Sequence, residues 1–444
     1  MDWSKLPDIL AVGLLATAFA SAARRSFTHV SGIWLTGWLL IVAHFVSDIF
    51  LPAPGLWGLI ANLMGIATLT WAGLLFMWAA VPYRGESSSR WMLLVLVASN
   101  TIYLCALVDA APPWVLNVAA ILIGAGPAAV MLTSIRRFHH PLRWAIILLC
   151  ACLSAFLLMV QQRPNIGPDL AMEGILFTVY FGCCLHFWYM YRRPTAGAFI
   201  TISAFLLWSL VFVIGPLMDA FFPQVHVESE VWNLPKYLVG VGMILLLLEE
   251  QIEHNKHLAL HDVLTGLPNR RLFQDRLANT LERARRTGTQ AALLVLDLDR
   301  FKQVNDTMGH HMGDLVLQRV ATAFSARIRK SDTVARTGGD EFSVILEGPT
   351  NSDEAHYVGR SLQDLLEDPL TVEGRTVKIG VSFGIAIFPD DATDMDSLCN
   401  SADLRMYENK RTGLESEDSY DPPPEHPTGT FKTTGNQGTI EMHL

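Results

Sequence analysis

Nine apolar runs fill the first 250 residues of this 444-residue chain and constrain its fold more than any other feature. Most are near the ~20 residues that an α-helix needs to cross the hydrocarbon core of a bilayer. The first and last runs are short, so eight spans are an alternative. An α-helical multi-pass membrane bundle is therefore expected over residues 1–248. The runs cover residues 9–23, 30–51, 56–81, 91–110, 114–133, 144–161, 174–191, 197–218 and 232–248.

Charged residues are distributed unevenly between the two halves of the chain. Residues 1–250 contain 12 Lys+Arg and 12 Asp+Glu, whereas residues 251–444 contain 21 and 30, which accounts for the net charge of −9. A charge-poor apolar half followed by a charged half predicts a membrane domain followed by a cytoplasmic one. The negative charge does not favour nonspecific binding to nucleic acid, so no nucleic-acid partner is expected.

Basic residues between the runs indicate the orientation in the membrane. With nine spans and an external N-terminus, nine arginines fall in cytoplasmic loops and three basic residues fall outside, as the positive-inside rule requires. The same topology places everything after residue 248 in the cytoplasm. The nine are Arg24, Arg25, Arg84, Arg90, Arg136, Arg137, Arg143, Arg192 and Arg193, and the three are Lys5, Arg163 and Lys236.

Polar residues inside the apolar runs have two readings. Ionisable groups at membrane depth often bind a ligand, a proton or a metal. Alternatively, they form hydrogen bonds between helices that hold the bundle together. His44 and Asp48 share one helix face because they are four residues apart, and no spacing motif supports His186 as a metal or haem ligand. The set comprises His44, Asn62, Asp48, Asn100, Asn117 and His186.

The segment that leaves the last apolar run has no Pro or Gly and predicts a connector helix over residues 249–260. Apolar residues and one Asn recur there at intervals of three and four. This spacing fits a short parallel coiled coil with a polar residue in its core, and it fits a plain amphipathic helix equally well. The positions are Leu245, Leu248, Ile252, Asn255 and Ala259.

From residue 261 the hydrophobic pattern alternates between the periods of helices and strands. Gly338-Gly339 between two short apolar segments predicts a hairpin turn. Helices interleaved among strands predict an α/β domain with a central, mostly antiparallel sheet flanked by helices. Expected helices cover 268–286, 312–329, 352–367 and 395–412, and expected strands cover 291–298, 333–336, 342–347 and parts of 370–388.

Two acidic sites stand out in this second half. Asp297 and Asp299 end an otherwise apolar strand, where a carboxylate loses hydration unless a cation or donor compensates it. Asp340 and Glu341 directly follow the Gly-Gly turn. If the strand lies beside the hairpin, Asp297 approaches the second pair, and clustered carboxylates share a hard cation such as Mg²⁺. Two such ions can clamp the reacting oxygens of a nucleotidyl transfer.

Several other classes of site are disfavoured by the sequence. The DLDRFKQVND segment fails as a calcium loop, because Phe301 occupies its fifth position and no Gly occupies the sixth. No Walker A pattern and no G-x-S-x-G motif occur. The six cysteines include no C-x-x-C pair, so neither a zinc finger nor a disulfide framework is expected.

Five ordered motifs between residues 259 and 413 resemble the GGDEF domain of bacterial diguanylate cyclases. The resemblance implies the palm-like fold of nucleotidyl cyclases. It also implies two GTP molecules as substrates and cyclic di-GMP as product. The motifs are DVLTGLPNRR (262–271), LDLDRFKQVNDTMGHHMGD (296–314), Gly338-Gly339-Asp340-Glu341-Phe342, VSFGIAIFP (381–389) and ADLRMYENK (402–410).

The resemblance also implies roles for individual residues. Asp340 and Glu341 match the catalytic acids, with Asp340 as base for the 3′-hydroxyl. Asp297, the carbonyl of Leu298, Asp340 and Glu341 match the ligands of two Mg²⁺ (or Mn²⁺) ions in each active site. The matching substrate contacts are Asn305 and Asp314 at the guanine, His310 beside the nucleotide, Gly338 and Gly339 at the turn, and Lys302 and Lys410 at the triphosphate.

Two further features concern phosphate binding and regulation. Where the family continues from its lysine to Gly-Arg-Asn, this chain has Gly413-Leu414-Glu415, so a second basic phosphate contact is missing. Arg329 and Asp332 match the family's R-x-x-D site for inhibition by cyclic di-GMP. Arg360 occupies the place of a second inhibitory arginine.

Taken together, the resemblance implies a diguanylate cyclase in the bacterial inner (cytoplasmic) membrane, in contact with the lipid bilayer and with its GGDEF domain in the cytoplasm. Catalysis then requires a homodimer in which two GTP-loaded domains face each other. The alternatives are a catalytically silent receptor for cyclic di-GMP and a transporter with a regulatory cap. The expected boundaries are 1–248 membrane domain, 249–260 connector helix, 261–413 GGDEF domain and 414–444 disordered tail.

Overall fold

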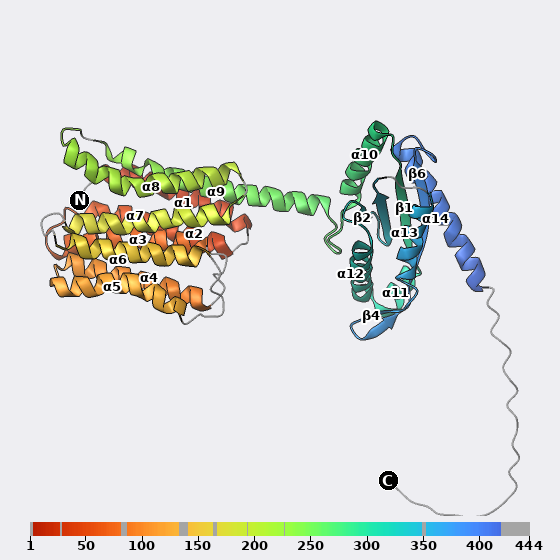
Figure 1. Ribbon diagram of the computed structural model, residues 1–444, viewed down its shortest axis with the longest axis horizontal. Helices are drawn as coiled ribbons and strands as arrows, with labels where there is room; N and C mark the ends of the chain where they lie inside the picture. Colours follow the sequence, from red (N-terminus) through yellow and green to blue (C-terminus); the bar gives the residue numbers. More distant parts are fainter. Residues whose placement is uncertain are drawn as a thin grey trace, which may run out of the picture. The chain divides into compact units, whose positions relative to one another are not determined.

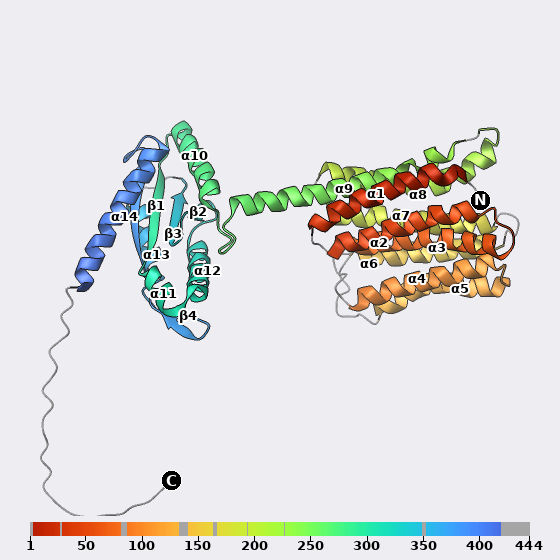
Figure 2. The same cartoon turned by 180° about the vertical axis from the view of Figure 1, so that it is seen from behind.

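The computed structural model describes eight stretches of the chain, which divides into two compact units, Met1–Asn255 and Lys256–Leu444 (Figures 1 and 2). The loop residues Arg84, Arg136, Arg137, Arg163 and Arg193, on which the predicted topology depends, lie outside these stretches, as does the tail from residue 419. The described stretches are 3–26, 29–80, 87–132, 141–162, 167–192, 194–225, 227–348 and 352–418.

The first unit is a bundle of α-helices (Figure 1). In the described stretches, eight helices are long and apolar enough to cross a membrane, and a ninth apolar segment, Trp144–Val160, is shorter. α1 and α9 extend beyond their apolar cores, and the choice between eight and nine spans stays a prediction. The elements are η1 (Trp3–Lys5), α1 (Leu6–Ser26), α2 (His29–Phe50), α3 (Leu56–Ala79), α4 (Ser87–Val108), α5 (Pro113–Leu132), α6 (Pro141–Val160), α7 (Gly167–Met190), α8 (Ala196–Phe221) and α9 (Ser229–Leu260).

Aromatic side chains fill the centre of this bundle. Trp34, Trp38, Tyr180 and Trp208 are fully buried, and the Tyr180 and Trp208 rings stack with centroids 3.8 Å apart. The Tyr180 hydroxyl donates to the carbonyl of Leu69 on α3 at 2.9 Å. Stacked rings and a satisfied hydroxyl therefore hold α7 against α3 and α8.

Three of the six polar residues noted within the apolar runs, His44, Asn100 and His186, contact a backbone carbonyl. Asn100 Nδ2 donates to the Leu96 carbonyl of its own helix at 2.8 Å. His44 Nδ1 reaches the Gly65 carbonyl on α3 at 3.0 Å, while its Nε2 lies 3.7 Å from Asp48 Oδ2. These contacts fit the reading in which polar groups stabilise the bundle.

A second polar group joins α9 to α1. Asp8 accepts from Asn233 Nδ2 at 3.0 Å and from the Tyr237 hydroxyl at 2.5 Å. The Lys236 ammonium donates to Asn233 Oδ1 at 2.7 Å and lies 4.8 Å from the centre of the Phe45 ring. Asp8, Asn233 and Lys236 are all buried. α9 itself continues without a break through the expected connector to Leu260.

The second unit contains an antiparallel four-stranded sheet with the order β2-β3-β1-β6 and a separate β4-β5 hairpin. An α/β domain with a central antiparallel sheet was predicted and is confirmed. The strands are β1 (Ala291–Asp299), β2 (Thr333–Arg336), β3 (Glu341–Leu346), β4 (Leu370–Val372), β5 (Arg375–Val377) and β6 (Gly380–Phe388), and the helices are α10 (Arg270–Thr287), α11 (Phe301–Met308), α12 (His310–Arg327), α13 (Ser352–Asp364) and α14 (Met395–Asp418).

Helices cover both faces of the sheet (Figures 1 and 2). Leu294 and Leu296 of β1 point to the face that packs against α12 and α13. Leu293 and Val295 point to the opposite face, which packs against α10 and α14. Burial on both faces explains why β1 is apolar throughout rather than alternating, up to the acidic residues at its end.

The structure differs from the sequence expectations at three places. The α11 helix was not expected, because it has only two turns and follows Arg300 at a positive φ of 60°. The strands expected within 370–388 contain a tight turn at Glu373 and Gly374, with φ of 48° and 74°. The last helix ends at Asp418 rather than near 412, since no Pro or Gly follows Gly413 before that residue. Residues 414–418, expected in the tail, are thus helical.

Candidate active site

Strand pairing brings the two acidic stretches together. Asp297 of β1 is the direct partner of Glu341 at the start of β3. Directly opposed residues in an antiparallel pair project to the same face, with Cβ atoms about 5 Å apart. The neighbouring Leu298 N–H donates to the Asp340 carbonyl at 3.2 Å, which ties the Gly-Gly turn to the end of β1. The geometry on which the metal-site hypothesis depends is therefore present.

The two glycines of the turn have different surroundings. A Cβ at Gly338 would lie 2.5 Å from Glu341 Oε2, so a side chain there would displace this carboxylate. A Cβ at Gly339 would meet nothing within 4 Å, and Gly339 is exposed. Gly338 thus makes room for the acid, whereas Gly339 leaves the outer side of the turn open for a phosphate to approach the backbone.

Arg336 holds the turn from the other side. Its Nε and Nη2 donate to the Gly339 carbonyl at 3.1 and 2.7 Å, and its Nη1 donates to Asp262 Oδ1 at 2.9 Å. Its backbone N–H donates to the Pro268 carbonyl at 2.9 Å. One guanidinium therefore links the opening segment of the domain to the Gly-Gly turn, a contact that sequence reasoning did not identify.

The acid pair lies in a strongly negative environment. Burial, then the charges of Asp297, Asp403 and Asp340, raise the pKa of Glu341, and Arg270 partly offsets them. Lys410 of α14 forms the direct counter-charge to Asp297, with Nζ 2.5 Å from Oδ1. Asp403 and Arg270 were not predicted, although both lie in motifs that were quoted from the sequence. Asp403 is seven residues before Lys410 and so shares its helix face.

These donors fit a magnesium ion. Among the described residues, no group of three or more His, Cys, Asp or Glu side chains could hold a metal. Mg²⁺, however, is usually held by one or two carboxylates, with waters and substrate phosphates completing the octahedron. Asp297, Glu341 and the Leu298 carbonyl supply hard oxygen donors, and the excess negative charge around Glu341 favours a cation. The expectation of two ions per site stays a prediction.

The predicted guanine-binding residues meet at the junction of α11 and α12. The Asn305 carbonyl accepts from Gly309 N–H at 2.9 Å. A Cβ at Gly313 would overlap the Asn305 side-chain oxygen, so this amide lies against the first turns of α12. Asp314 follows directly and is exposed, as are His310 and Lys302. Asn305 and Asp314 are thus neighbours, and their pairing with guanine stays a prediction.

The three predicted inhibitory residues are not all in one place. Arg329 and Asp332 form a turn in which Asp332 N–H donates to the Arg329 carbonyl at 3.0 Å. Arg329 pairs with Glu354 at 2.9 Å. Asp332 lines a pocket of 570 Å³ whose basic side chains the sequence analysis did not single out. They are Arg276, Arg283 and Arg286 of α10, and Lys330.

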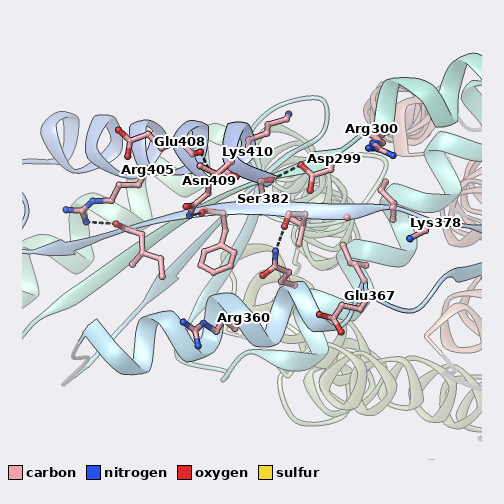
Figure 3. A pocket seen from close by; sticks show the side chains of 18 of the residues that line it. Asp299, Arg300, Arg360, Glu367, Lys378, Ser382, Arg405, Glu408, Asn409 and Lys410 are labelled. Atoms are coloured by element: carbon pink, nitrogen blue, oxygen red, sulfur yellow. Dashed lines mark hydrogen bonds between the residues drawn. The ribbon is translucent and has the colours of Figure 1, made fainter. Parts of the chain in front are cut away.

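Arg360 instead lines a different cavity, a groove of 1510 Å³ between α11, α13, α14 and the β5–β6 segment (Figure 3). This groove runs along the open edge of β6 and reaches the acid pair only through Asp299 and Lys410. Asp299 accepts from the Ser382 hydroxyl at 2.8 Å and so belongs to the groove. Although this groove is large, its size therefore does not identify it as the nucleotide-binding site.

Comparison with known proteins identifies this half of the chain. Residues 259–416 match the family model described as "Diguanylate cyclase, GGDEF domain". Diguanylate cyclase TpbB from Pseudomonas aeruginosa is 38% identical over 165 residues, covering 37% of this chain and 38% of TpbB. Diguanylate cyclase DosC from Escherichia coli is 35% identical over 175 residues, covering 39% of this chain and 38% of DosC. The solved GGDEF domain of TpbB is 39% identical, with 34% of this chain and 89% of that chain covered and a TM-score of 0.34.

The likeness to curated relatives is confined to one part of each protein. The chain spans less than two fifths of the length of TpbB and DosC, and 23% of the bifunctional cyclase/phosphodiesterase MucR from Pseudomonas aeruginosa, to which it is 43% identical. The family match begins at residue 259, in the final turn of α9, and so does not include the apolar bundle. The motif order, the antiparallel sheet and the family match together show that residues 259–416 form a GGDEF domain of the diguanylate cyclase family.

Proposed function

We propose that the chain is a diguanylate cyclase that condenses two GTP molecules into cyclic di-GMP and two pyrophosphates. The observation that carries the proposal is the direct pairing of Asp297 with Glu341 beside the Gly-Gly turn. Both acids of the motif and the partner strand are intact, which a purely structural hairpin would not need. GGDEF relatives with named cyclase activity support the same reaction.

Each side chain has a definable task in this reaction. Asp297, Glu341 and the Leu298 carbonyl would hold Mg²⁺, which when bound neutralises phosphate charge and acidifies the attacking hydroxyl. Asp340 accepts the proton from the 3′-hydroxyl. Asp314 accepts from guanine N1–H and the 2-amino group, a donor pair that adenine lacks, and this selects GTP over ATP. Asn305 contacts the same purine edge.

Lys410 has a second task that its contact with Asp297 implies. In the structure its ammonium pairs with Asp297. When a cation and a triphosphate occupy the site, Lys410 is released from that pairing and becomes a phosphate contact, together with Lys302. The same lysine thus stabilises the site in both states, because it always lies beside the larger negative charge.

The reaction requires two copies of the domain, since each holds one GTP and each 3′-oxygen attacks the α-phosphorus of the other nucleotide. The rate of the reaction then depends on how the two domains position their nucleotides relative to each other. We propose that the apolar bundle spans the bacterial inner membrane and sets the mutual orientation of two domains through α9. Cyclic di-GMP inhibits by binding at Arg329 and Asp332, of which Asp332 lines the pocket that also contains the basic residues of α10.

Product analysis tests the proposed activity. The full-length chain in detergent micelles, incubated with GTP and Mg²⁺, should yield cyclic di-GMP by mass spectrometry. Glu341→Gln should abolish the product because the amide cannot replace the carboxylate. Glu408→Gln, an exposed change on α14 in the groove, serves as the matched control and should keep the wild-type rate.

The 570 Å³ basic pocket is the one observation that favours the alternative, a catalytically silent receptor. A receptor would bind radiolabelled cyclic di-GMP through Arg329 and Asp332 yet release no pyrophosphate from GTP. Binding without turnover in wild-type protein, with affinity lost in Arg329→Ala, would replace the cyclase proposal by that reading.

A further inference from the structure

Two histidines lie one helical turn apart at the end of α9, outside every site described above. His257 is in the last turn of the helix, and His261 follows it directly, with its N–H donating to the His257 carbonyl at 2.9 Å. The two imidazole rings stack with centroids 4.1 Å apart and planes inclined by 9°. His257 is exposed and His261 is half-buried, so the pair is open to solvent on one side.

One hydrogen bond fixes which ring nitrogen of His261 is free. His261 Nδ1 lies 3.1 Å from the His257 carbonyl oxygen. A carbonyl only accepts, so Nδ1 carries the proton and donates. The neutral ring then presents the lone pair of Nε2 away from the backbone. A backbone carbonyl that orients one imidazole nitrogen is the usual support of a metal-bound histidine.

Other charged groups do not compete for this pair. The adjacent Asp262 carboxylate already accepts from Thr265 N–H and hydroxyl at 2.9 and 2.7 Å and from Arg336 at 2.9 Å. Among the ion pairs of the described residues, none involves His257 or His261. The two imidazole rings therefore lie side by side with no carboxylate paired to either.

We propose that His257 and His261 form a two-histidine binding site for a late first-row divalent cation such as Cu²⁺, Ni²⁺ or Zn²⁺. Two imidazole nitrogens at ~2.05 Å from a shared ion lie about 2.9–3.3 Å apart for right-angled to tetrahedral geometry. In the stacked arrangement, with ring planes inclined by only 9°, the two lone pairs lie alongside each other. The exposed His257 ring therefore turns out of the stack to share an ion with Nε2 of His261. In the described stretches no third His, Cys, Asp or Glu joins them, so water completes the coordination.

The ligand chemistry distinguishes this site from the acid pair. Imidazole favours Cu²⁺, Ni²⁺ and Zn²⁺, whereas Mg²⁺ prefers oxygen ligands. A bound ion would also join the ends of one helical turn. His261 forms a β-bridge with Pro268, and the Pro268 carbonyl accepts from Arg336 N–H at 2.9 Å. The site thus lies at the start of a contact chain that ends at the Gly-Gly turn.

Hydrogen exchange tests the site independently of cyclase activity. The untagged, chelator-treated full-length chain is exchanged with and without Ni²⁺, and exchange is read by mass spectrometry on peptides covering residues 257–262. Exchange at these amides should slow by about tenfold with Ni²⁺, because chelation resists opening of the turn. Mg²⁺ at the same concentration should leave it unchanged.

Variants decide whether these two rings hold the ion. His257→Gln and His261→Gln should each remove the Ni²⁺ effect. His311→Gln, an exposed histidine elsewhere in the domain, should keep it. Unchanged exchange in wild-type protein with Ni²⁺, or the same slowing in both pair variants, would overturn the proposal, whatever the chain does with GTP.

Discussion

At the scale of single residues, Glu341 combines two opposed requirements. In the proposed site its carboxylate holds a cation, yet burial and the charges of Asp297, Asp403 and Asp340 raise its pKa. A raised pKa in the folded state means that ionisation of Glu341 disfavours folding, so the domain is less stable above that pKa than below it. Active sites often carry such local instability in exchange for function.

Glu341→Gln should therefore stabilise the domain at neutral pH in the absence of metal, although it removes activity. The gain should disappear as the pH falls through the raised pKa, where wild-type Glu341 is itself protonated. Urea denaturation, followed by hydrogen exchange of β1 and β3 amides, measures both. Mg²⁺ should protect wild-type protein and not the variant, and a variant less stable than wild type at pH 7 would contradict the explanation.

Arg336 makes a second residue-scale prediction, because its guanidinium bonds Gly339 and Asp262 at the same time. Lysine keeps the charge but lacks the planar fork, so Arg336→Lys should lower turnover about tenfold or more with a smaller change in KM for GTP. Steady-state kinetics with Arg327→Lys, a change on the exposed end of α12, as control measures this. An unchanged kcat would show that turnover does not depend on the contacts that the Arg336 guanidinium makes with the Gly-Gly turn.

The same contact has a pH dependence that can be checked. Burial opposes ionisation of Asp262, but hydrogen bonds from Thr265 and Arg336 prevail and lower its pKa. The lowered pKa means that ionised Asp262 stabilises the fold when the pH is above the pKa of the unfolded state. This stabilisation is lost as the pH falls through the pKa of the folded state. Asp262→Asn should therefore lose stability at pH 7 but differ little from wild type at a pH well below the unfolded value of about 3.9, where the folded carboxyl is also protonated. Urea midpoints at the two pH values measure it.

The sequence identified residues whose type conflicts with their surroundings. Asp297 was found because a carboxylate ends an apolar strand, and Glu341 because it follows two glycines. Arg336, Asp403 and Arg270 carry no such conflict, since each is an ordinary charged residue whose partner comes from another element. Only the fold brings these partners together, so no local pattern could have revealed them.

At the scale of elements, strong hydrophobic periodicity was sufficient to predict a helix or strand. Short elements could not be predicted in this way. The apolar segment 291–298 and the Gly-Gly turn predicted β1, β2 and β3 nearly to their ends. The α11 helix was missed because eight residues give too few turns for a period to emerge. The β4-β5 hairpin was not separated from β6, since Glu373-Gly374 is a less familiar turn pair than Asn-Gly.

Edge strand β6 illustrates how the open edge of a sheet is protected from pairing with another chain. The carbonyls on its open side accept from side chains: Phe383 from Asn409 at 2.8 Å, Ile385 from Arg405 at 2.6 Å and Val381 from Gln363 at 3.2 Å (Figure 3). Uncovered edges pair with other chains and aggregate. The groove along this edge is thus closed to strand addition by its own lining.

Removing two of these caps should expose the edge. The double variant Arg405→Ala/Asn409→Ala should form concentration-dependent oligomers, because two carbonyls of β6 become available to another strand. Light scattering over a range of protein concentrations measures it. Glu408→Ala/Thr412→Ala, two changes on the same helix that remove no cap, should behave as wild type. Equal scattering from both double variants would mean that the edge is protected otherwise.

At the scale of the whole molecule, the sequence predicted the two units by hydropathy and charge alone, and the division observed at Asn255 lies close to the expected connector. What hydropathy could not predict is how the helices bond to one another. The Asp8, Asn233, Lys236 and Tyr237 group joins the two ends of the bundle's sequence. Asp8 is more than 200 residues from the other three in sequence, so only the folded bundle reveals their partnership.

This polar group makes the prediction that concerns regulation. If α9 transmits the state of the bundle, loosening its attachment to α1 should change the cyclase rate. Asp8→Asn removes the carboxylate that accepts from Asn233 and Tyr237, while the Lys236 ammonium stays buried on Asn233, so the bundle should lose stability. Asp8→Asn/Lys236→Gln removes both charges and should recover much of that stability. Tryptophan fluorescence reports on the bundle alone, because every tryptophan lies in residues 1–250, and cyclic di-GMP formation reports on the other unit. A destabilised bundle with an unchanged rate per folded chain would mean that α9 anchors the domain without controlling it.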